Sequence, residues 1–269
     1  MENDDRPVGQ ILSRRDALKL LGVGSAAFLA ACASPNQSST VVPTIASSAT
    51  GSALDCIVRP ELTIGPYFVD DQLNRSDIRS EPSDGSVKEG VPLTLQINVF
   101  DVANNSCTPL EGAKVDIWHC DALGVYSGVS ERGFDTTGLK FLRGYQLTDA
   151  NGGVQFITIY PGWYSGRAVH IHFMIRTTTP ESQSYEFTSQ FFFDDALTDQ
   201  VHAQEPYSSK GQRDTRNADD NIYNGGGDQL LLNTEGDNAN GYTAAINIGL
   251  DLTDAEVGQS DQQGGGPPP

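Results

Sequence analysis

Val91-Pro-Leu-Thr-Leu-Gln-Ile-Asn-Val99 is the stretch that decides the fold of this chain. Apolar residues stand at 91, 93, 95, 97 and 99, and Thr, Gln and Asn separate the later ones. Successive side chains of a β-strand point to opposite faces, so this period of two predicts a strand with one buried and one exposed face. The segment therefore indicates a sheet that packs one of its faces against a core.

More segments of this kind follow, separated by clusters of Gly, Asn, Asp and Pro. We expect strands over residues 113–120, 141–148, 154–159, 168–177, 187–193 and 244–252. Strands at this spacing with little helix between them predict an all-β domain, an antiparallel β-sandwich with long loops and at most short helices.

Three local signals refine this prediction. Asp149-Ala-Asn-Gly-Gly153 is typical of a hairpin turn between two strands. A short helix is expected over residues 196–203, with Asp195 as its N-cap. Residues 205–227 are polar and rich in Gly, which predicts a loop.

The N-terminus has the pattern of an export signal. Ser13-Arg-Arg-Asp-Ala-Leu-Lys19 is a twin-arginine pattern, and the apolar run after it ends in the lipobox Leu29-Ala-Ala-Cys32. That run is shorter than the roughly 20 residues that span a bilayer, which disfavours a transmembrane anchor. We therefore expect export by the twin-arginine route and an extracytoplasmic protein that is attached to the membrane only by a lipid on Cys32.

This signal divides the chain into four parts. Residues 1–31 are the predicted twin-arginine and lipoprotein signal peptide, and residues 32–54 are a flexible tether rich in Ser and Thr. Residues 55–253 are the β-sandwich domain, and residues 254–269 are a disordered tail rich in Gly and Pro. About 200 central residues are enough for one well-cored domain. The sequence does not indicate an oligomeric state.

Charge and cysteine content limit the partners and the compartment. The net charge of −18 argues against nucleic acid or anionic lipid as a partner. Cys56, Cys107 and Cys120 remain beyond the signal, so an oxidising compartment predicts one disulfide and one free thiol, with all three pairings open. A thiolate metal site is disfavoured because no C-x-x-C spacing occurs.

Tyr160-Pro-Gly-Trp-Tyr-Ser-Gly-Arg-Ala-Val-His-Ile-His172 concentrates groups that carry chemistry. In a strand, His170 and His172 share one face, while Val169, Ile171 and Phe173 share the other. Imidazole is the commonest metal ligand, and these are two of only four histidines in the chain. The stretch predicts a metal site; a pair of ordinary half-buried polar residues is the alternative.

Three other segments complete a family resemblance. They are Trp118-His-Cys-Asp-Ala-Leu-Gly-Val-Tyr126, Phe187-Thr-Ser-Gln190 and Thr63-Ile-Gly-Pro-Tyr67. Together with Gly162-Trp-Tyr-Ser-Gly-Arg-Ala-Val-His-Ile-His172, they make the chain resemble the intradiol ring-cleavage dioxygenases, the family of catechol and protocatechuate dioxygenases. The likeness is strongest to the secreted, single-domain branch, and it covers roughly residues 55–200.

The resemblance implies an iron enzyme. Its ligands to non-haem ferric iron, Fe(3+), match Tyr126, Tyr164, His170 and His172. The implied reaction inserts both atoms of O2 into a catecholic ring, cleaves it between the hydroxyls and gives a product of the cis,cis-muconate type, with no organic cofactor. Two tyrosinates and a hydroxide neutralise a ferric ion, and hard oxygen donors with imidazole favour ferric iron over softer metals.

The resemblance also assigns residues around the metal. Arg167 matches a catalytic, substrate-contacting position, and Gln190 matches a residue that makes hydrogen bonds in or beside the active site. Gly65, Pro66 and Tyr67 match a segment that lines the substrate pocket. The structural alternatives are a surface salt bridge for Arg167, a satisfied strand amide for Gln190 and an ordinary Gly-Pro turn.

Some assignments have competitors among similar residues. Tyr160 competes with Tyr164 for the second tyrosine position, and Tyr164 is preferred because it follows the Pro161-Gly162 turn as the family's ligand does. Tyr145 competes with Tyr126, but an aromatic residue at the edge or in the core explains it better. His119 and His202 are interpreted as structural, in a strand and on the short helix.

Two rival functions remain at this stage. The first is a β-sandwich lipoprotein that binds a ligand without catalysis, since fold alone does not fix function. The second is a ferrous facial triad of His170, His172 and Asp121, which would cleave the ring beside the hydroxyls.

Overall fold

The computed structural model describes residues 56–103 and 106–253. By its internal contacts the chain divides into residues 1–51 and 52–269, and all of the described residues belong to the second unit. The predicted signal (1–31), tether (32–54) with its lipid on Cys32, and tail (254–269) lie outside the described residues and stay predictions. Within the described ranges, no helix is long and apolar enough to cross a membrane.

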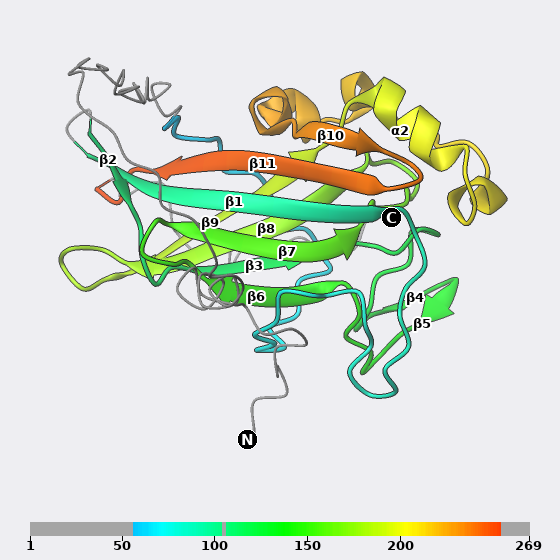
Figure 1. Cartoon of the computed structure of the whole chain (residues 1–269), viewed down its shortest axis with the longest axis horizontal. Helices are drawn as coiled ribbons and strands as arrows, with labels where there is room; N and C mark the ends of the chain where they lie inside the picture. Colours follow the sequence, from blue (N-terminus) through cyan, green and yellow to red (C-terminus); the bar gives the residue numbers. More distant parts are fainter. Residues whose placement is uncertain (1–55, 104–105, 254–269) are drawn as a thin grey trace, which may run out of the picture. The chain divides into compact units, whose positions relative to one another are not determined.

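Two β-sheets form the domain, with β11, β1 and β7 of one sheet in front of β9, β8 and β3 of the other in Figure 1. The first has the order β10 (Asn233–Asp237), β11 (Gly241–Leu250), β1 (Pro92–Ala103) and β2 (Ser106–Pro109), and β7 (Gly153–Ile159) also pairs with β1. The second has the order β6 (Arg143–Leu147), β3 (Lys114–Trp118), β8 (His170–Thr178) and β9 (Ser184–Phe192). A separate ribbon joins β4 (Ser130–Glu131) to β5 (Phe134–Asp135). The predicted β-sandwich is confirmed.

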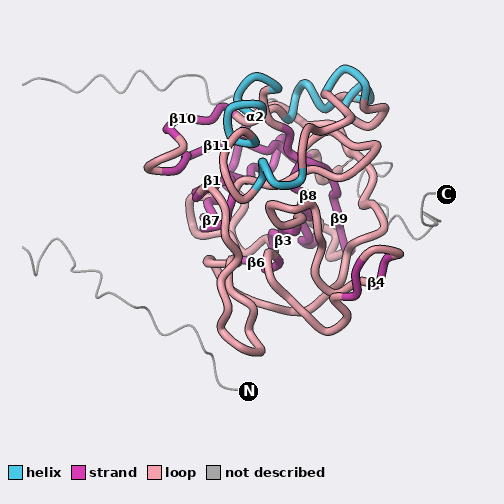
Figure 2. Tube along the Cα trace, turned by 90° about the vertical axis from the view of Figure 1, so that its right-hand side faces the viewer, coloured by secondary structure: helices cyan, strands magenta, loops and turns pink. Residues whose placement is uncertain are grey.

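Helical segments are short and gather on one side of the strands (Figure 2). They are α2 (Asp195–His202), η1 (Tyr207–Lys210), η2 (Asn217–Asp219), η3 (Tyr223–Gly225) and η4 (Gly227–Leu230). The longest, α2, has eight residues, as the prediction of at most short helices requires.

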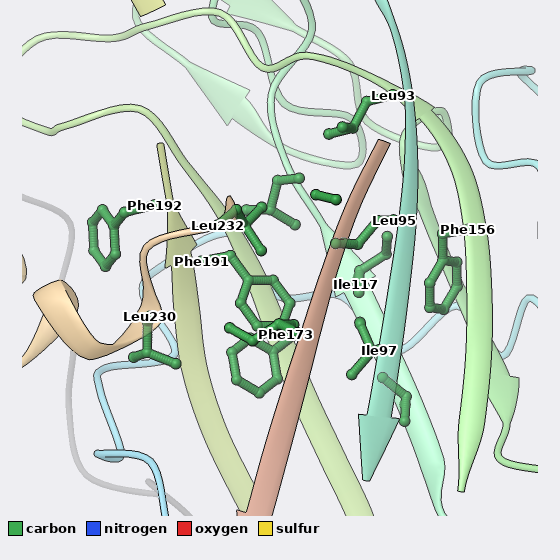
Figure 3. Close-up of a cluster of buried hydrophobic side chains, with 14 of the residues drawn as sticks. Leu93, Leu95, Ile97, Ile117, Phe156, Phe173, Phe191, Phe192, Leu230 and Leu232 are labelled. Carbon is green, nitrogen blue, oxygen red and sulfur yellow. The ribbon is translucent and has the colours of Figure 1, made fainter. Parts of the chain in front are cut away.

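The core lies between the two sheets and follows the alternation of the opening segment. Leu93, Leu95 and Ile97 of β1 are completely buried, and they face Phe173 and Phe191 of the other sheet (Figure 3). The rings of Phe173 and Phe191 stack with centroids 4.0 Å apart. Full burial of one such side chain contributes roughly 1.5–3 kcal/mol, so this layer holds the sheets together.

Two details of the predicted topology are wrong. The sandwich is not wholly antiparallel, because β1 and β11 run parallel with Leu93 opposite Tyr242. The turn at Asp149–Gly153 forms, but it does not make a hairpin, since β6 pairs with β3 and β7 pairs with β1 in the other sheet. The turn instead carries the chain from one sheet to the other.

Two predictions for the helical side also need correction. Asp194, not Asp195, is the N-cap of α2, because its side chain accepts hydrogen bonds from the amides of Ala196 and Leu197. Asp195 instead pairs with Arg213 at 2.5 Å. The stretch 205–227 is not a plain loop, since it contains η1, η2 and η3.

The cysteine pairing is resolved. Cys56 and Cys107 form a disulfide that ties the start of the described chain to β2. Cys120 is free and buried. One disulfide with one free thiol is the arrangement that the sequence predicted for an oxidising compartment.

His119 is a structural histidine, as the sequence indicated, and it makes folding sensitive to pH. It is fully buried, its Nε2 lies 2.7 Å from the hydroxyl of Thr158, and its Nδ1 lies 2.8 Å from the carbonyl oxygen of Cys120. Burial lowers the pKa of His119 to about 4 from the usual 6.5. Between pH 6.5 and pH 4, His119 is therefore protonated in the unfolded chain but stays neutral in the folded chain. The free energy of unfolding consequently falls as the pH decreases towards 4.

We predict that this histidine alone lowers the free energy of unfolding by about 3 kcal/mol between pH 6.5 and pH 4. Urea unfolding of the metal-free protein over this range checks the value, with His119→Gln as the comparison. In the variant, the free energy of unfolding should depend less steeply on pH, by the contribution of about one proton. Equal slopes in the two proteins would contradict the prediction.

Candidate active site

Tyr126 is presented by a tight turn at the end of β3. The carboxylate of Asp121 accepts hydrogen bonds from the amides of Leu123 and Val125, and Gly124 adopts φ +78°. The turn places the Tyr126 side chain in the interior, with 1% of its surface exposed. Among the described residues, its hydroxyl has no hydrogen-bond partner, and burial raises its pKa well above 10.

Tyr164 is presented by the Pro161-Gly162 turn that follows β7. A Cβ at Gly162 would lie 2.4 Å from the carbonyl oxygen of Ala122, so only glycine lets this turn touch the turn that carries Tyr126. The two tyrosine rings lie with centroids 5.7 Å apart. The Tyr164 hydroxyl is 3.2 Å from Nε2 of His170, and burial raises the pKa of the phenol.

The two histidines lie on one face of β8, as the sequence predicted, while Ile171 and Phe173 enter the core from the other. Nδ1 of His170 is 2.6 Å from the carbonyl oxygen of Ala168, which can only accept, so this nitrogen carries the proton. The Nε2 lone pair then faces Tyr164 and Nε2 of His172, 3.1 Å away. The His172 ring stacks on Trp118 at 5.0 Å.

Both imidazoles are neutral at ordinary pH. Burial lowers the pKa of His170 and His172 well below 6.5, and the positive charge of Arg167 lowers both further. Neutral imidazole is the form that binds metals, and the tautomer of His170 is in addition fixed by Ala168. The histidines are therefore prepared as ligands.

The arrangement of donors fits a metal cation. Among the described residues, the Tyr126 hydroxyl is buried without a hydrogen-bond partner. Buried polar atoms are normally paired, and a cation at the centre would satisfy the phenol oxygens and imidazole lone pairs that meet there. Donors about 2 Å from one cation and at right angles lie about 3 Å apart. The separations of 3.1 Å and 3.2 Å around His170 match this value.

Tyr160 points elsewhere. Its hydroxyl lies 2.7 Å from that of Thr198 on α2, and its ring packs against Phe193 with centroids 4.3 Å apart. The structure therefore places Tyr164, not Tyr160, with the histidines. Tyr145 lies on β6 beneath the ammonium of Lys114.

Arg167 is held beside the site by two partners. Its Nε donates to Asp220 at 2.9 Å and its Nη2 donates to the side-chain oxygen of Gln190 at 2.5 Å. The amide of Gln190 in turn donates to the carbonyl oxygen of Thr63 at 2.8 Å. The predicted catalytic pair is thus in direct contact, and Gln190 orients the guanidinium.

Asp220 is the residue that sequence reasoning missed. Its side chain is 1% exposed, and the same Oδ2 also accepts from the amide of Ala168 at 2.8 Å. Its other oxygen accepts from the amide of Ile222 at 2.7 Å. The available signal was that an arginine held at least partly in the interior needs an anion, but the acidic stretch downstream offered many candidates.

The predicted pocket segment lies against the tyrosines. Tyr67 stacks on Tyr126 with centroids 4.4 Å apart and meets Tyr164 edge-on at 6.0 Å. Gly65 adopts φ +71°, and a Cβ there would lie 2.9 Å from the His172 ring. Pro66 between them is exposed. The backbone of Tyr67 is fixed by a hydrogen bond from Arg143 to its carbonyl oxygen at 2.6 Å.

Asp121 does not join His170 and His172. Its carboxylate pairs with Lys88 at 2.9 Å and caps its own turn. Among the described residues, no group of three or more His, Cys, Asp or Glu is placed to hold a metal ion. A ferrous facial triad built on Asp121 is therefore not assembled.

His202 lies on α2, where its Nε2 meets the carbonyl oxygen of Pro161 at 3.0 Å.

Comparison with known proteins identifies the family of the chain. Residues 63–209, more than half of the chain, match the model of a family described as dioxygenase. An intradiol ring-cleavage dioxygenase from Tetranychus urticae is 30% identical, with a TM-score of 0.63 over 74% of this chain and 97% of that one. The chain belongs to the intradiol ring-cleavage dioxygenases. Both tyrosine-bearing turns and the whole of β8 and β9 fall inside the family match.

Two further dioxygenases resemble the chain. The dioxygenase domain of a dioxygenase–carbohydrate-binding protein fusion from Streptomyces sp. SirexAA-E is 30% identical, with a TM-score of 0.51 over 72% of this chain and 99% of that one. Catechol 1,2-dioxygenase from Acinetobacter baylyi is 38% identical over 84 residues, which is 30% of this chain and 24% of that enzyme. The chain thus matches about a quarter of the length of that curated relative.

Proposed function

We propose that the protein is a non-haem ferric-iron dioxygenase that cleaves a catecholic ring between its hydroxyls. Both atoms of O2 enter the ring, which opens to a dicarboxylate of the cis,cis-muconate type. One observation carries the proposal: the phenols of Tyr126 and Tyr164 meet two neutral imidazoles, with Tyr164 and His172 both within 3.2 Å of Nε2 of His170.

The donor set favours ferric iron for electrostatic reasons. Burial keeps both phenols protonated in the metal-free protein, since it raises the pKa of each. A trivalent cation reverses this preference by stabilising the phenolates. Two phenolates and two imidazoles are hard and intermediate donors, which suit Fe(3+) better than soft metals. Tyr126, Tyr164, His170 and His172 would hold the iron.

The rest of the site binds and orients the substrate. When bound, the iron supplies Lewis acidity towards the two oxygens of a catecholate. The phenolate oxygen of Tyr126 or Tyr164 is a base that accepts a proton from a catechol hydroxyl. Tyr67 stacks on Tyr126 and lines the place where an aromatic ring would lie. Gly65 lets this segment pass close to the His172 ring, because a Cβ there would lie 2.9 Å from it.

Arg167 supplies fixed positive charge next to the reacting ring. Gln190 and Asp220 hold its guanidinium from two sides, so it needs no rearrangement when negative charge develops on the substrate. A prepositioned cation in a partly dry site stabilises such charge more than one in water does.

The iron-loaded protein should be coloured and active. We expect a visible absorption band from charge transfer between tyrosinate and ferric iron. Aerobic assays with a panel of catechols should give ring-opened dicarboxylates that contain two labelled atoms when the dioxygen is isotopically labelled. The zinc-loaded protein is the matched control, and it should be colourless and inactive.

Three results would contradict this proposal. Cleavage beside the hydroxyls would indicate extradiol chemistry. A colourless protein with stoichiometric iron would exclude the tyrosine ligands. Tight binding of catechols without turnover by the iron-loaded protein would favour a binding lipoprotein.

A further inference from the structure

The turn that carries Tyr164 is held by side chains at each of its carbonyl groups. The carbonyl oxygens of Tyr160, Pro161, Gly162 and Trp163 are satisfied in order by Tyr207 at 2.7 Å, His202 at 3.0 Å, Cys120 at 3.5 Å and Lys210 at 2.6 Å. Three of these four side chains come from α2 and η1. The amides of Tyr160 and Gly162 also donate to the carbonyl oxygens of Val91 and Asp121, and the side-chain contacts complete the support of the turn.

Of the three side chains from α2 and η1, Lys210 is the one that also donates to the turn that carries Tyr126. Its ammonium donates to the carbonyl oxygen of Leu123 at 2.6 Å as well as to that of Trp163. It lies 4.8 Å from the centre of the Trp163 ring. Leu123 is three residues before Tyr126, and Trp163 directly precedes Tyr164.

The two turns are tightly packed at their junction, where Gly124 meets Trp163 and the ammonium group of Lys210. A Cβ at Gly124 would lie 2.1 Å from the carbonyl oxygen of Trp163 and 2.3 Å from Nζ of Lys210. The two backbones therefore touch directly, with carbonyl oxygens of both turns directed at one point. Two such oxygens repel each other unless a cation lies between them, and hydrogen bonds from an ionised donor are among the stronger ones in proteins.

We propose that Lys210 is a positioning residue that fixes the spacing of the two tyrosine-bearing turns. By bridging Leu123 and Trp163, it sets where the phenols of Tyr126 and Tyr164 stand relative to the histidines of β8. The consequence for the metal rests on the proposed function, whereas the bridge between the turns does not.

Hydrogen exchange in the metal-free full chain tests the bridge by itself. In Lys210→Met, amide exchange in residues 121–126 and 160–166 is expected to become about tenfold faster or more, because both turns lose a charged donor. Lys114→Met is the matched control, since Lys114 also lies over an aromatic ring, at 4.2 Å from Tyr145, but away from both turns. It should leave these two segments unchanged.

The iron-loaded protein then tests the consequence for the site. Lys210→Met should shift or broaden the tyrosinate charge-transfer band and reduce kcat by about 10- to 100-fold, because small displacements of reacting groups are costly. Lys210→Arg keeps the charge and should restore most of the protection and the band. Gly124→Ala, which intrudes on the same junction, should reproduce the effect of Lys210→Met.

Unchanged exchange in both turns of Lys210→Met would overturn the proposal. So would faster exchange spread over the whole domain, which would make Lys210 a general stabilising residue. If Lys210→Met fails to fold, Lys210→Gln and Gly124→Ala decide by the same measurement. Failure of the wild type to bind iron would refute the proposed function but leave the exchange result for the bridge intact.

Discussion

Tyr164→Phe is expected to lower kcat for catechol cleavage by about a thousandfold, equivalent to about 4 kcal/mol of activation free energy. The Tyr164 hydroxyl is the phenol that lies 3.2 Å from Nε2 of His170, so its loss removes an oxygen donor from the centre of the site. The charge-transfer band of the iron-loaded protein should weaken and shift at the same time. Steady-state kinetics, bound iron and the visible spectrum measure these effects.

Tyr160→Phe is the matched control, because it removes the same hydroxyl four residues away. Tyr160 is completely buried and bonds to Thr198, so its variant should lose only about 0.5–1.5 kcal/mol of stability. Its colour and kcat should stay close to those of the wild type. If Tyr160→Phe bleached the protein while Tyr164→Phe did not, the assignment of the tyrosine ligand would be reversed.

The site residues could be predicted from the sequence where neighbouring residues determine how a side chain is presented. His170 and His172 share a face because of the period of a strand, and Tyr164 follows a turn that Pro161 and Gly162 specify. Asp220 was not readable, because it reaches Arg167 across 53 residues and lies in a polar stretch. Spacing along the chain cannot indicate which of several acidic residues becomes buried.

In the fold, too, the elements marked by a local pattern could be predicted and those fixed by distant contacts could not. The alternation of Leu93, Leu95 and Ile97 predicted β1, because the face of the strand that carries them is fully buried. β10 and β2 have mostly exposed residues and no apolar alternation, so no periodic signal marks them. The parallel pairing of β1 with β11 joins residues about 150 positions apart. Such pairing is fixed by the packing of the whole sandwich and leaves no local trace.

The N-cap of α2 could not be assigned from residue preferences alone. Asp194 and Asp195 are adjacent and chemically identical, and both suit a cap. The choice depends on Arg213, which stands 18 residues further along the chain, beyond the end of α2, and pairs with Asp195. A tertiary contact thus decides between two equal local signals.

Asp220→Asn is expected to destabilise the protein by about 3 kcal/mol and to lower kcat/KM for catechol by about 100-fold. One oxygen of Asp220 accepts from both Arg167 and the amide of Ala168. Asparagine has only one acceptor oxygen. If this oxygen accepts from the amide of Ile222, an NH2 group that cannot accept faces Arg167 and the amide of Ala168. If it faces Arg167, it is an uncharged acceptor, and the NH2 group faces the amide of Ile222. The guanidinium loses its anion and no longer stays where Gln190 and the substrate meet it.

Controls separate the catalytic effect from loss of stability. Arg216→Gln breaks a half-exposed pair with Asp199 on the same side of the molecule and should cost less than about 1 kcal/mol, with no change in kcat/KM. In an Arg167→Met background, Asp220→Asn should reduce kcat/KM little further, because both substitutions act through one guanidinium. Urea unfolding and kinetics of the wild type, the three single variants and the double variant provide the values. Reduced stability of Asp220→Asn with unchanged kcat/KM would mean that Arg167 holds the turn together and takes no part in ring cleavage.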